Sequence, residues 1–244
     1  MNSLKEKTVL VVGGGTGIGR GAAAALAAEG ARVAIAGRRA DKLQEVADAY
    51  AGEPVIACHP VDVTQRDSVA ALVEWAEATL GRIDVLVHCA GINVPERTID
   101  VLTPEGWDRV LATNATGAFN VISAVLPAMR TRRDGLIVNI SSISGKRASQ
   151  LGGVAYSAAK FAQTALGTAV GLELAHSGVR ISNIYPGEVN TPILDLRANP
   201  PGPEHRAQIL QPEDVAAAIV MIAKMPPRAH VSEMVIKPTT QEFA

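Results

Sequence analysis

Residues 8–19 read TVLVVGGGTGIG, and this stretch decides the fold. The apolar run Thr8–Val12 predicts a buried strand, and the alanine-rich stretch Gly17–Glu29 predicts the helix that follows it. Glycines in the turn between them permit a tight bend and let main-chain N–H groups approach a pyrophosphate, whose charge the helix N-terminus stabilises. A glycine-rich turn can also be purely structural, but its place between a first strand and a first helix favours nucleotide binding.

Short β-branched runs alternate with longer helical patterns along the rest of the chain. Further strands are expected at 32–36, 55–61, 83–89, 136–141, 180–185 and 233–237, and helices at 41–50, 68–80, roughly 104–131 and 155–176. Parallel strands joined by helical crossovers produce this order. The sequence therefore predicts an α/β fold: one doubly wound, Rossmann-type domain over residues 1–244, with a parallel sheet of about seven strands and helices on both faces. Only Glu188–Pro212, rich in proline and polar residues, reads as irregular.

Composition excludes several classes of partner. The 244 residues carry 23 Lys+Arg against 24 Asp+Glu, and this balance argues against nucleic acid or an anionic membrane as partner. The N-terminus has no apolar segment of the kind found in signal peptides, and unbroken apolar runs such as Val215–Ala223 are too short to span a bilayer. Cys58 and Cys89 form no disulfide framework, which indicates the cytoplasm. The histidines show no metal-ligand spacing, so no metal site is predicted.

The end of the second strand indicates which dinucleotide is bound. Folds that bind NAD place Asp or Glu there to accept hydrogen bonds from the ribose 2′-hydroxyl. Here the position holds Gly37, followed by Arg38 and Arg39. A guanidinium binds a 2′-phosphate through charge-assisted hydrogen bonds, whereas an acid repels it. The sequence therefore favours NADP(H), the alternative being that both arginines are solvated loop charges.

A second group of residues carries the chemistry of a reacting centre. Tyr156 and Lys160 lie four residues apart on one face of a predicted helix, and a nearby ammonium, helped by oxidised nicotinamide, is expected to lower the pKa of the phenol toward the working range. Ser142 ends a predicted strand, at the sheet edge where doubly wound folds build their sites. Asn114 falls inside the long helix near 104–131, where a local kink and a water bridging to Lys160 would account for it. Taken singly, the Tyr–Lys pair also fits an ordinary helix surface, and Asn114 a helix-packing amide.

The glycine spacing and these four residues together resemble the short-chain dehydrogenase/reductase family. The glycines follow G-x-x-x-G-x-G, through Gly13, Gly17 and Gly19, and not the common G-x-G-x-x-G. The resemblance runs from about Lys7 to Thr191. It implies hydride transfer between nicotinamide and a carbonyl or alcohol, with Tyr as general acid/base, Ser orienting the carbonyl, Lys holding the nicotinamide ribose and Asn positioning a proton-relay water.

The resemblance also implies the contacts of the cofactor. Asp62 and Val63 would lie at the adenine, and the Val189 main chain and the Thr191 side chain at the nicotinamide amide. The implied cofactor residues are Gly13, Gly15, Thr16, Gly17, Ile18, Gly19, Arg38, Arg39, Asp62, Val63, Ala90, Gly91, Tyr156, Lys160, Pro186, Gly187, Val189 and Thr191.

Three positions depart from the family pattern. Val12 replaces the threonine that usually precedes the first glycine. His88 and Cys89 replace two asparagines at the end of the fourth strand, which puts the sheet-bracing role of those asparagines in doubt. Cys89 is expected to be a small packed residue, although its nearness to the cofactor leaves a redox role open.

The substrate is expected to be a small ketone, aldehyde or hydroxy acid. The resemblance makes the segment of approximately 188–212 the substrate lid, in which Leu194, Leu196 and Arg197 could face a ligand, although Arg197 is better interpreted as a solvated surface residue. Two alternatives remain open: a 3-oxoacyl-thioester (acyl-carrier-protein) reductase, and a non-catalytic NADP-binding regulatory protein. The two long helices carry small and apolar residues on faces that pair across subunits in the family that the chain resembles, so the resemblance implies a homodimer or homotetramer, although apolar faces serve an intramolecular core equally well.

Overall fold

The computed structural model describes residues 3–242 and contains the predicted parallel sheet. Its seven strands run in the order β3-β2-β1-β4-β5-β6-β7, all pairs parallel. Every predicted strand is present, and β3 and β4 are shorter than predicted. The strands are β1 Thr8–Val12, β2 Arg32–Gly37, β3 Ala57–Pro60, β4 Val85–His88, β5 Gly135–Ile140, β6 Val179–Pro186 and β7 Glu233–Ile236.

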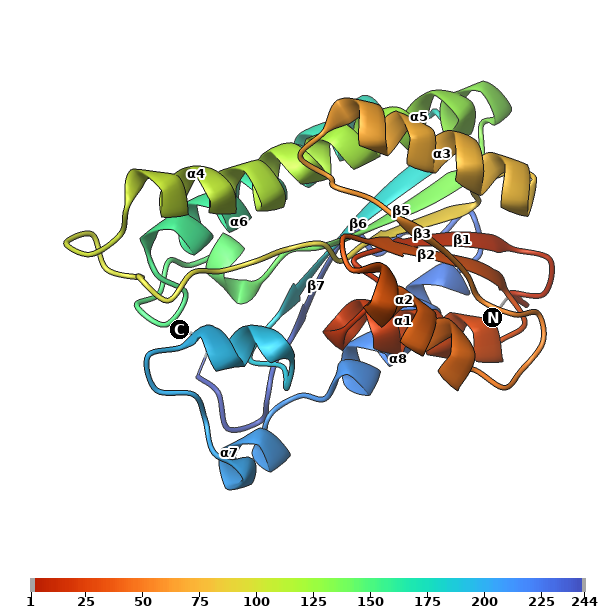
Figure 1. Cartoon of the computed structure of the whole chain (residues 1–244). Coiled ribbons are helices and arrows are strands. Elements are labelled where there is room, and N and C mark those ends of the chain that lie inside the picture. The colour runs from red at the N-terminus through yellow and green to blue at the C-terminus, as the bar shows by residue number, and fades with distance from the viewer. Residues whose placement is uncertain (1–2, 243–244) are drawn as a thin grey trace.

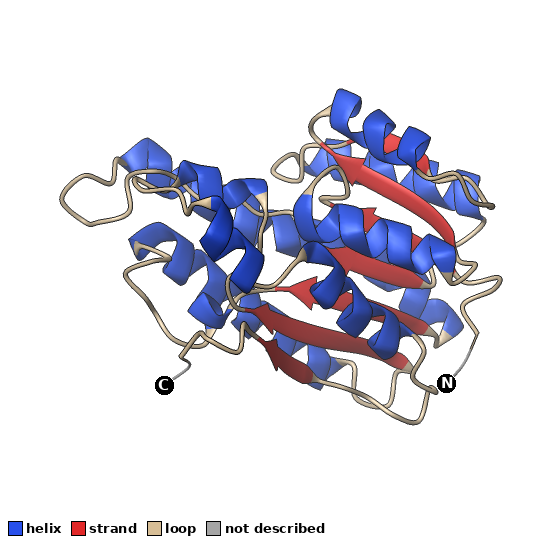
Figure 2. Cartoon of the chain, turned by 90° about the horizontal axis from the view of Figure 1, so that it is seen from below, coloured by secondary structure: helices blue, strands red, loops and turns tan. Residues whose placement is uncertain are grey.

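Helices cover both faces of the sheet, as predicted. Figure 1 shows α3 and α5 on one face and α1, α2 and α8 on the other, and Figure 2 shows the twisted sheet between these layers. The helical segments are α1 Gly17–Ala28, α2 Ala40–Ala49, α3 Arg66–Leu80, α4 Pro104–Leu111, η1 Ala112–Thr116, α5 Gly117–Arg132, η2 Ile143–Gly145, α6 Val154–Glu173, η3 Pro192–Leu196, α7 Pro203–Gln208 and α8 Pro212–Ala223.

Strand β1 explains why an unbroken apolar run is needed at the centre of such a sheet. Val9 and Val11 belong to the core formed with α1 and α8, whereas Leu10 and Val12 belong to the core on the opposite face. All residues of the strand are buried. A strand buried on both faces requires apolar side chains at every position rather than at alternate ones.

The strand order also fixes where a site can form. The chain adds strands on one side of β1 as far as β3, and then returns to place β4 on the other side. The loops after β1 and β4 therefore diverge and leave a crevice at the carboxyl edge of the sheet, which is where doubly wound folds bind their ligands.

The long helix predicted near 104–131 is interrupted. A π-helical turn, η1, lies between α4 and α5 and contains Asn114, so the helix departs from regular α geometry at the residue where a local kink is predicted. Together the three segments span Pro104–Arg132, a length of 29 residues. This helix is long and apolar enough to cross a bilayer by length and composition alone, although polar residues interrupt its apolar runs. Half of its most apolar stretch is buried inside the domain, as it is for a core helix.

The C-terminal quarter of the chain is more regular than the sequence predicted. The stretch read as irregular contains η3 and α7, and α8 follows directly. Helix α8 begins with a capping box, in which Gln211 accepts from the main chain at Asp214 and the Asp214 carboxylate accepts from the Gln211 N–H. Pro212 takes the first helical position. These signals are local, and the sequence analysis missed them.

Candidate active site

The turn between β1 and α1 is too tight for any side chain at two of its glycines. The N–H groups of Gly13 and Gly14 both donate to the Ala36 carbonyl, at 2.7 and 3.0 Å. A Cβ on Gly13 would lie 2.6 Å from the Ala90 nitrogen, and one on Gly19 would lie 2.1 Å from the Gly13 oxygen. The glycines therefore let β1, α1 and the loop after β4 meet around one cleft.

The start of α1 fits a pyrophosphate. The side chain of its N-cap residue Thr16 makes no capping hydrogen bond, and the first turn contains no acidic residue. By contrast, Thr103 caps α4 by accepting from the Gly106 N–H. The first N–H groups of α1 thus keep their positive partial charge for a ligand in the cleft, which has a volume of about 490 Å³.

The cleft also holds the cations predicted to select NADP(H). Arg38 and Arg39 line it beside Gly37, and Arg39 Nη2 lies 3.5 Å from Thr16 Oγ1. The sequence analysis missed a third cation, Lys42, which lines the same cleft and pairs with Glu45. This end of the cleft is therefore rich in cations, the electrostatic setting that a 2′-phosphate requires.

Most of the predicted cofactor residues converge on this cleft, but three do not. Pro186, Gly187 and Val189 line a second cavity that adjoins the cleft, so their contact with the cofactor stays a prediction. The Gly187 N–H continues the pairing with β7 by donating to Ile236 O at 2.7 Å. The predicted residues that line the cleft are Gly13, Gly15, Thr16, Gly17, Ile18, Gly19, Arg38, Arg39, Asp62, Val63, Ala90, Gly91, Tyr156, Lys160 and Thr191.

The second cavity, of about 560 Å³, adjoins the cleft at Tyr156. Tyr156 lines both spaces, whereas Ser142 lines only the second cavity and Lys160 only the cleft. The phenol therefore stands at the boundary, with the serine on one side and the lysine on the other. A substrate in the second cavity would meet a cofactor in the cleft at this side chain.

Burial sets the ionisation of the phenol. It raises the pKa of Tyr156, and a hydrogen bond with Ser142 and the positive charge of Arg97 offset this only in part. The ammonium of Lys160 lies 5.7 Å from the ring centroid and is held by other groups, and the lowering of this pKa by Lys160 together with oxidised nicotinamide stays a prediction. The Tyr156 hydroxyl thus keeps its proton and is in the form that donates to a carbonyl oxygen.

Lys160 is held by a buried polar network that the sequence analysis missed. Its ammonium donates to Ile140 O at 3.0 Å and to Gln163 Oε1 at 2.8 Å. Gln163 in turn donates to Asn139 Oδ1 at 2.7 Å, and Asn139 donates to Asn183 Oδ1 at 2.8 Å. Burial nevertheless lowers the pKa of Lys160 to about 7. The lysine is therefore fixed in place and close to changing its charge at neutral pH.

Asn114 faces the same space as Lys160. Its side-chain amide is bound twice by Ile92, whose N–H donates to Oδ1 at 2.8 Å and whose carbonyl accepts from Nδ2 at 2.9 Å. A Cβ built on Gly91 would lie 3.5 Å from Asn114 Oδ1 and 3.6 Å from Lys160 Nζ. The missing side chain of Gly91 thus leaves a space flanked by both polar groups.

Gly91→Ala is expected to fold normally and to lose about tenfold or more in turnover. The added methyl makes only ordinary van der Waals contacts, but it fills the space in which a water could join Asn114 to Lys160. Thermal unfolding and single-turnover kinetics measure the two effects. Gly202→Ala is the matched control, because its Cβ would have no heavy atom within 4 Å. Unchanged turnover in Gly91→Ala would contradict the relay.

His88 and Cys89, which depart from the family pattern, contribute no charge to the site. Burial and the neighbouring Lys160 lower the pKa of His88 to about 3, and neither ring nitrogen has a hydrogen-bond partner within the described chain. Burial raises the pKa of the Cys89 thiol to about 12, which removes the thiolate that redox chemistry needs. Asn139 and Asn183 supply the polar contact between neighbouring strands instead.

Fold and site together define an oxidoreductase built on a Rossmann-type domain, and comparison with known proteins identifies its family. The family model for short chain dehydrogenases matches residues 7–200, and the chain belongs to the short-chain dehydrogenase/reductase family. An uncharacterised oxidoreductase of Staphylococcus aureus strain MRSA252 is 34% identical over 238 residues, 98% of this chain and 100% of that protein.

Solved structures agree with this assignment. The closed form of serine dehydrogenase complexed with NADP⁺ superposes with a TM-score of 0.87 at 28% identity, covering 97% of each chain. The 3-ketoacyl-(acyl-carrier-protein) reductase from Brucella melitensis complexed with NADH gives 0.86 at 26% identity, covering 96% of this chain and 98% of that one. The two carry different dinucleotides, so the choice of cofactor has to be argued from this chain's own residues.

Proposed function

We propose that this chain is an NADPH-dependent oxidoreductase that reduces the carbonyl group of a small ketone, aldehyde or oxo acid, or oxidises the corresponding alcohol. The observation that carries the proposal is the position of Tyr156, at the boundary between a cleft suited to a dinucleotide and a separate cavity. A bound NADPH would supply the hydride. The residues of the chain would bind the substrate, orient it and move the proton.

The geometry supports a distinct role for each of the four polar residues. Ser142 and Tyr156 would both hydrogen-bond the carbonyl oxygen, and Tyr156 would donate its proton to that oxygen as the hydride arrives at carbon. Lys160, on the cleft side of the phenol, would bind the cofactor ribose and stabilise the resulting phenolate. Asn114 would hold the water through which the proton is replaced.

The preference for NADPH rests on Arg38 and Arg39. Arg38→Asp is expected to lower kcat/KM for NADPH relative to NADH by roughly tenfold to a hundredfold, because the carboxylate repels a 2′-phosphate and accepts from a 2′-hydroxyl. Steady-state kinetics with both cofactors measure the ratio. Arg228→Asp makes the same change of charge at an exposed position outside both cavities. A ratio that moves equally in both variants would refute the assignment.

We further propose that a second copy of the chain covers α5 and α6. Phe119 on α5 and Phe161 and Leu172 on α6 are 47%, 43% and 76% exposed, and large apolar side chains exposed on neighbouring elements are typical of interfaces. Light scattering is expected to give a dimer or tetramer, which the double variant Phe119→Glu/Phe161→Glu dissociates. Val55→Glu, at an apolar residue 68% exposed before β3, should leave the mass unchanged. A monomeric wild-type chain would exclude this interface.

A further inference from the structure

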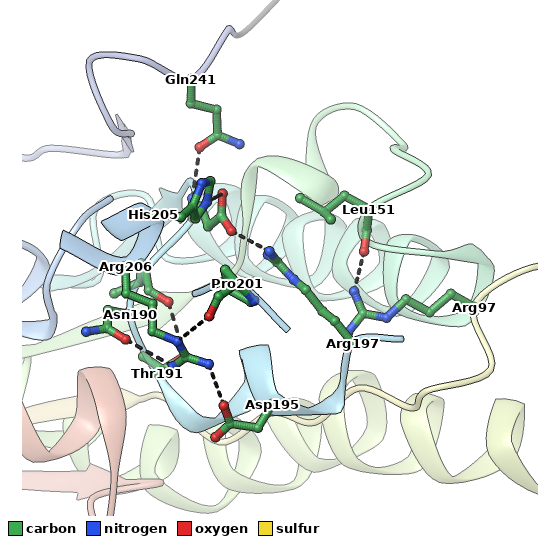
Figure 3. Close-up of polar contacts among 12 residues, drawn as sticks. Arg97, Leu151, Asn190, Thr191, Asp195, Arg197, Pro201, His205, Arg206 and Gln241 are labelled. Atoms are coloured by element: carbon green, nitrogen blue, oxygen red, sulfur yellow. Dashed lines mark hydrogen bonds and ion pairs between the residues drawn. The ribbon is translucent and has the colours of Figure 1, made fainter. Parts of the chain in front are cut away.

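Two of the three arginines that line the second cavity, Arg97 and Arg197, interact electrostatically. Arg97 comes from the loop after β4 and Arg197 from the segment after η3, and Figure 3 shows their side chains next to each other. Burial and the neighbouring charge of Arg197 both lower the pKa of Arg97. Like charges placed together inside a cavity repel, so the arrangement carries a cost unless an anion lies between them.

The two guanidinium groups differ in how their charge is balanced. Arg197 pairs with Glu188, with side chains only 14% and 9% exposed, so the prediction of a solvated surface arginine is wrong. His205 makes a second contact with Glu188, at 3.0 Å. Burial opposes the ionisation of Glu188, but its hydrogen bonds with Arg197 and His205 outweigh this and lower its pKa. The negative charge of Glu188 is therefore balanced by Arg197 and His205 and does not balance the charge of Arg97.

Arg97 has no such partner. Its Nε donates to Val94 O at 3.3 Å and its Nη1 to Leu151 O at 2.5 Å, and within residues 3–242 it forms no ion pair. These main-chain contacts hold the planar group in one orientation, and its charge acts on the Tyr156 hydroxyl. A fixed, half-buried guanidinium that has no carboxylate partner in the protein is suited to bind the carboxylate of a ligand.

We propose that the substrate of this site is a carboxylate, a short oxo acid or the corresponding hydroxy acid, whose anionic group binds Arg97 and Arg197 while its carbonyl carbon lies at Tyr156. The inference rests on the proposed function and names its substrate class. In the reductive direction a bound NADPH would supply the hydride for the new C–H bond, and Tyr156 would donate its proton to the carbonyl oxygen, where the former π electrons form the O–H bond. The products are a hydroxy acid and NADP⁺. The carboxylate does not react.

Measuring kcat/KM for charged and uncharged substrates in wild type and in Arg97 variants separates binding of the carboxylate from the reduction step. The substrates are 2-oxobutanoate, 3-oxobutanoate and 4-oxopentanoate, each compared with its methyl ester, which keeps the carbonyl and removes the charge. Wild type is expected to prefer at least one acid over its ester by about tenfold or more in kcat/KM. Arg97→Gln should remove that preference, because it slows the acid about tenfold more than it slows the ester.

Two further variants control for structural damage. Arg97→Lys keeps the charge and should restore part of the preference, because the ammonium attracts the carboxylate without the planar fork. Arg228→Gln removes an exposed arginine outside both cavities and should leave the preference intact. Equal losses for acid and ester in Arg97→Gln would mean that Arg97 only supports the loop, and would overturn the proposal.

A binding measurement provides a readout that needs no turnover. Calorimetry with the enzyme and NADP⁺ compares butanoate with butanamide, which have similar shapes and different charges. If wild type binds butanoate more tightly than butanamide and Arg97→Gln loses this difference, the anion site is supported. If, in addition, no carbonyl compound is reduced, the anion site stands and the proposed function is refuted. Reduction of neutral ketones without any preference for acids or for butanoate would overturn the anion site alone.

Discussion

Tyr156→Phe is expected to lower turnover by about 10²–10⁴-fold while the protein still folds and binds NADPH. The ring contributes to a small apolar cluster with Val94, Val110, Ala155 and Ala159, and phenylalanine preserves these contacts. Only the hydroxyl is lost, and with it the proton donor at the boundary between the cleft and the cavity. The hydride would then create an alkoxide with no acid beside it.

Stopped-flow absorbance of the nicotinamide measures the hydride step, and fluorescence titration measures NADPH binding. Tyr185→Phe is the matched control: this tyrosine is also buried, but its hydroxyl donates to Glu233 at 2.8 Å and it lines neither the cleft nor the second cavity. The control should lose stability and keep turnover. If Tyr156→Phe retained a tenth or so of wild-type turnover, the acid/base role would have to be abandoned.

Lys160→Met is expected to abolish turnover and to change how stability depends on pH. Burial lowers the pKa of Lys160 from 10.5 to about 7, so the folded chain disfavours the ammonium that the unfolded chain retains. Between these two values the unfolded state binds more protons than the folded state. The free energy of unfolding that the lysine contributes therefore rises with pH across this interval, by about 1.4 kcal/mol per pH unit. At or below pH 7 the full cost of the buried ammonium is present.

Urea unfolding at several pH values between 7 and 10 tests this sign. Wild type should gain stability relative to Lys160→Met as the pH rises, because methionine has no proton to lose. Lys224→Met removes a lysine that pairs with Glu29 at the surface, and it reports on the general effect of pH. Parallel pH profiles for wild type and Lys160→Met would show that the lysine is not desolvated as described.

The parts of the molecule that follow local rules were predicted from the sequence. The apolar run of β1, the glycine turn and the alternation of strands and helices specify the sheet, because each depends on neighbours along the chain. The tyrosine and lysine were found because one helix turn brings them together. The departure from regular helix geometry at Asn114 was predicted because asparagine is a poor residue for a helix interior.

The network around Lys160 and the arginine pair depend on the fold itself. Asn139 and Asn183 lie on adjacent strands that are distant in sequence, and Arg97 and Arg197 come from loops a hundred residues apart. No spacing along the chain signals such encounters. The rise in the pKa of Tyr156 caused by burial was not predicted for the same reason, since desolvation depends on everything that surrounds the phenol.

The π-helical turn around Asn114 has a consequence for insertions and deletions. A single π turn inside an α-helix amounts to one extra residue accommodated without breaking the helix. Deleting one residue within Ala112–Thr116 would let α4 and α5 merge into a regular α-helix and leave their relative rotation nearly unchanged, because the wide turn already absorbs the extra residue. The Asn114 amide would then lose its two hydrogen bonds with the main chain of Ile92. A deletion in this turn should therefore disturb the contacts of Asn114 more than the packing of α4 and α5.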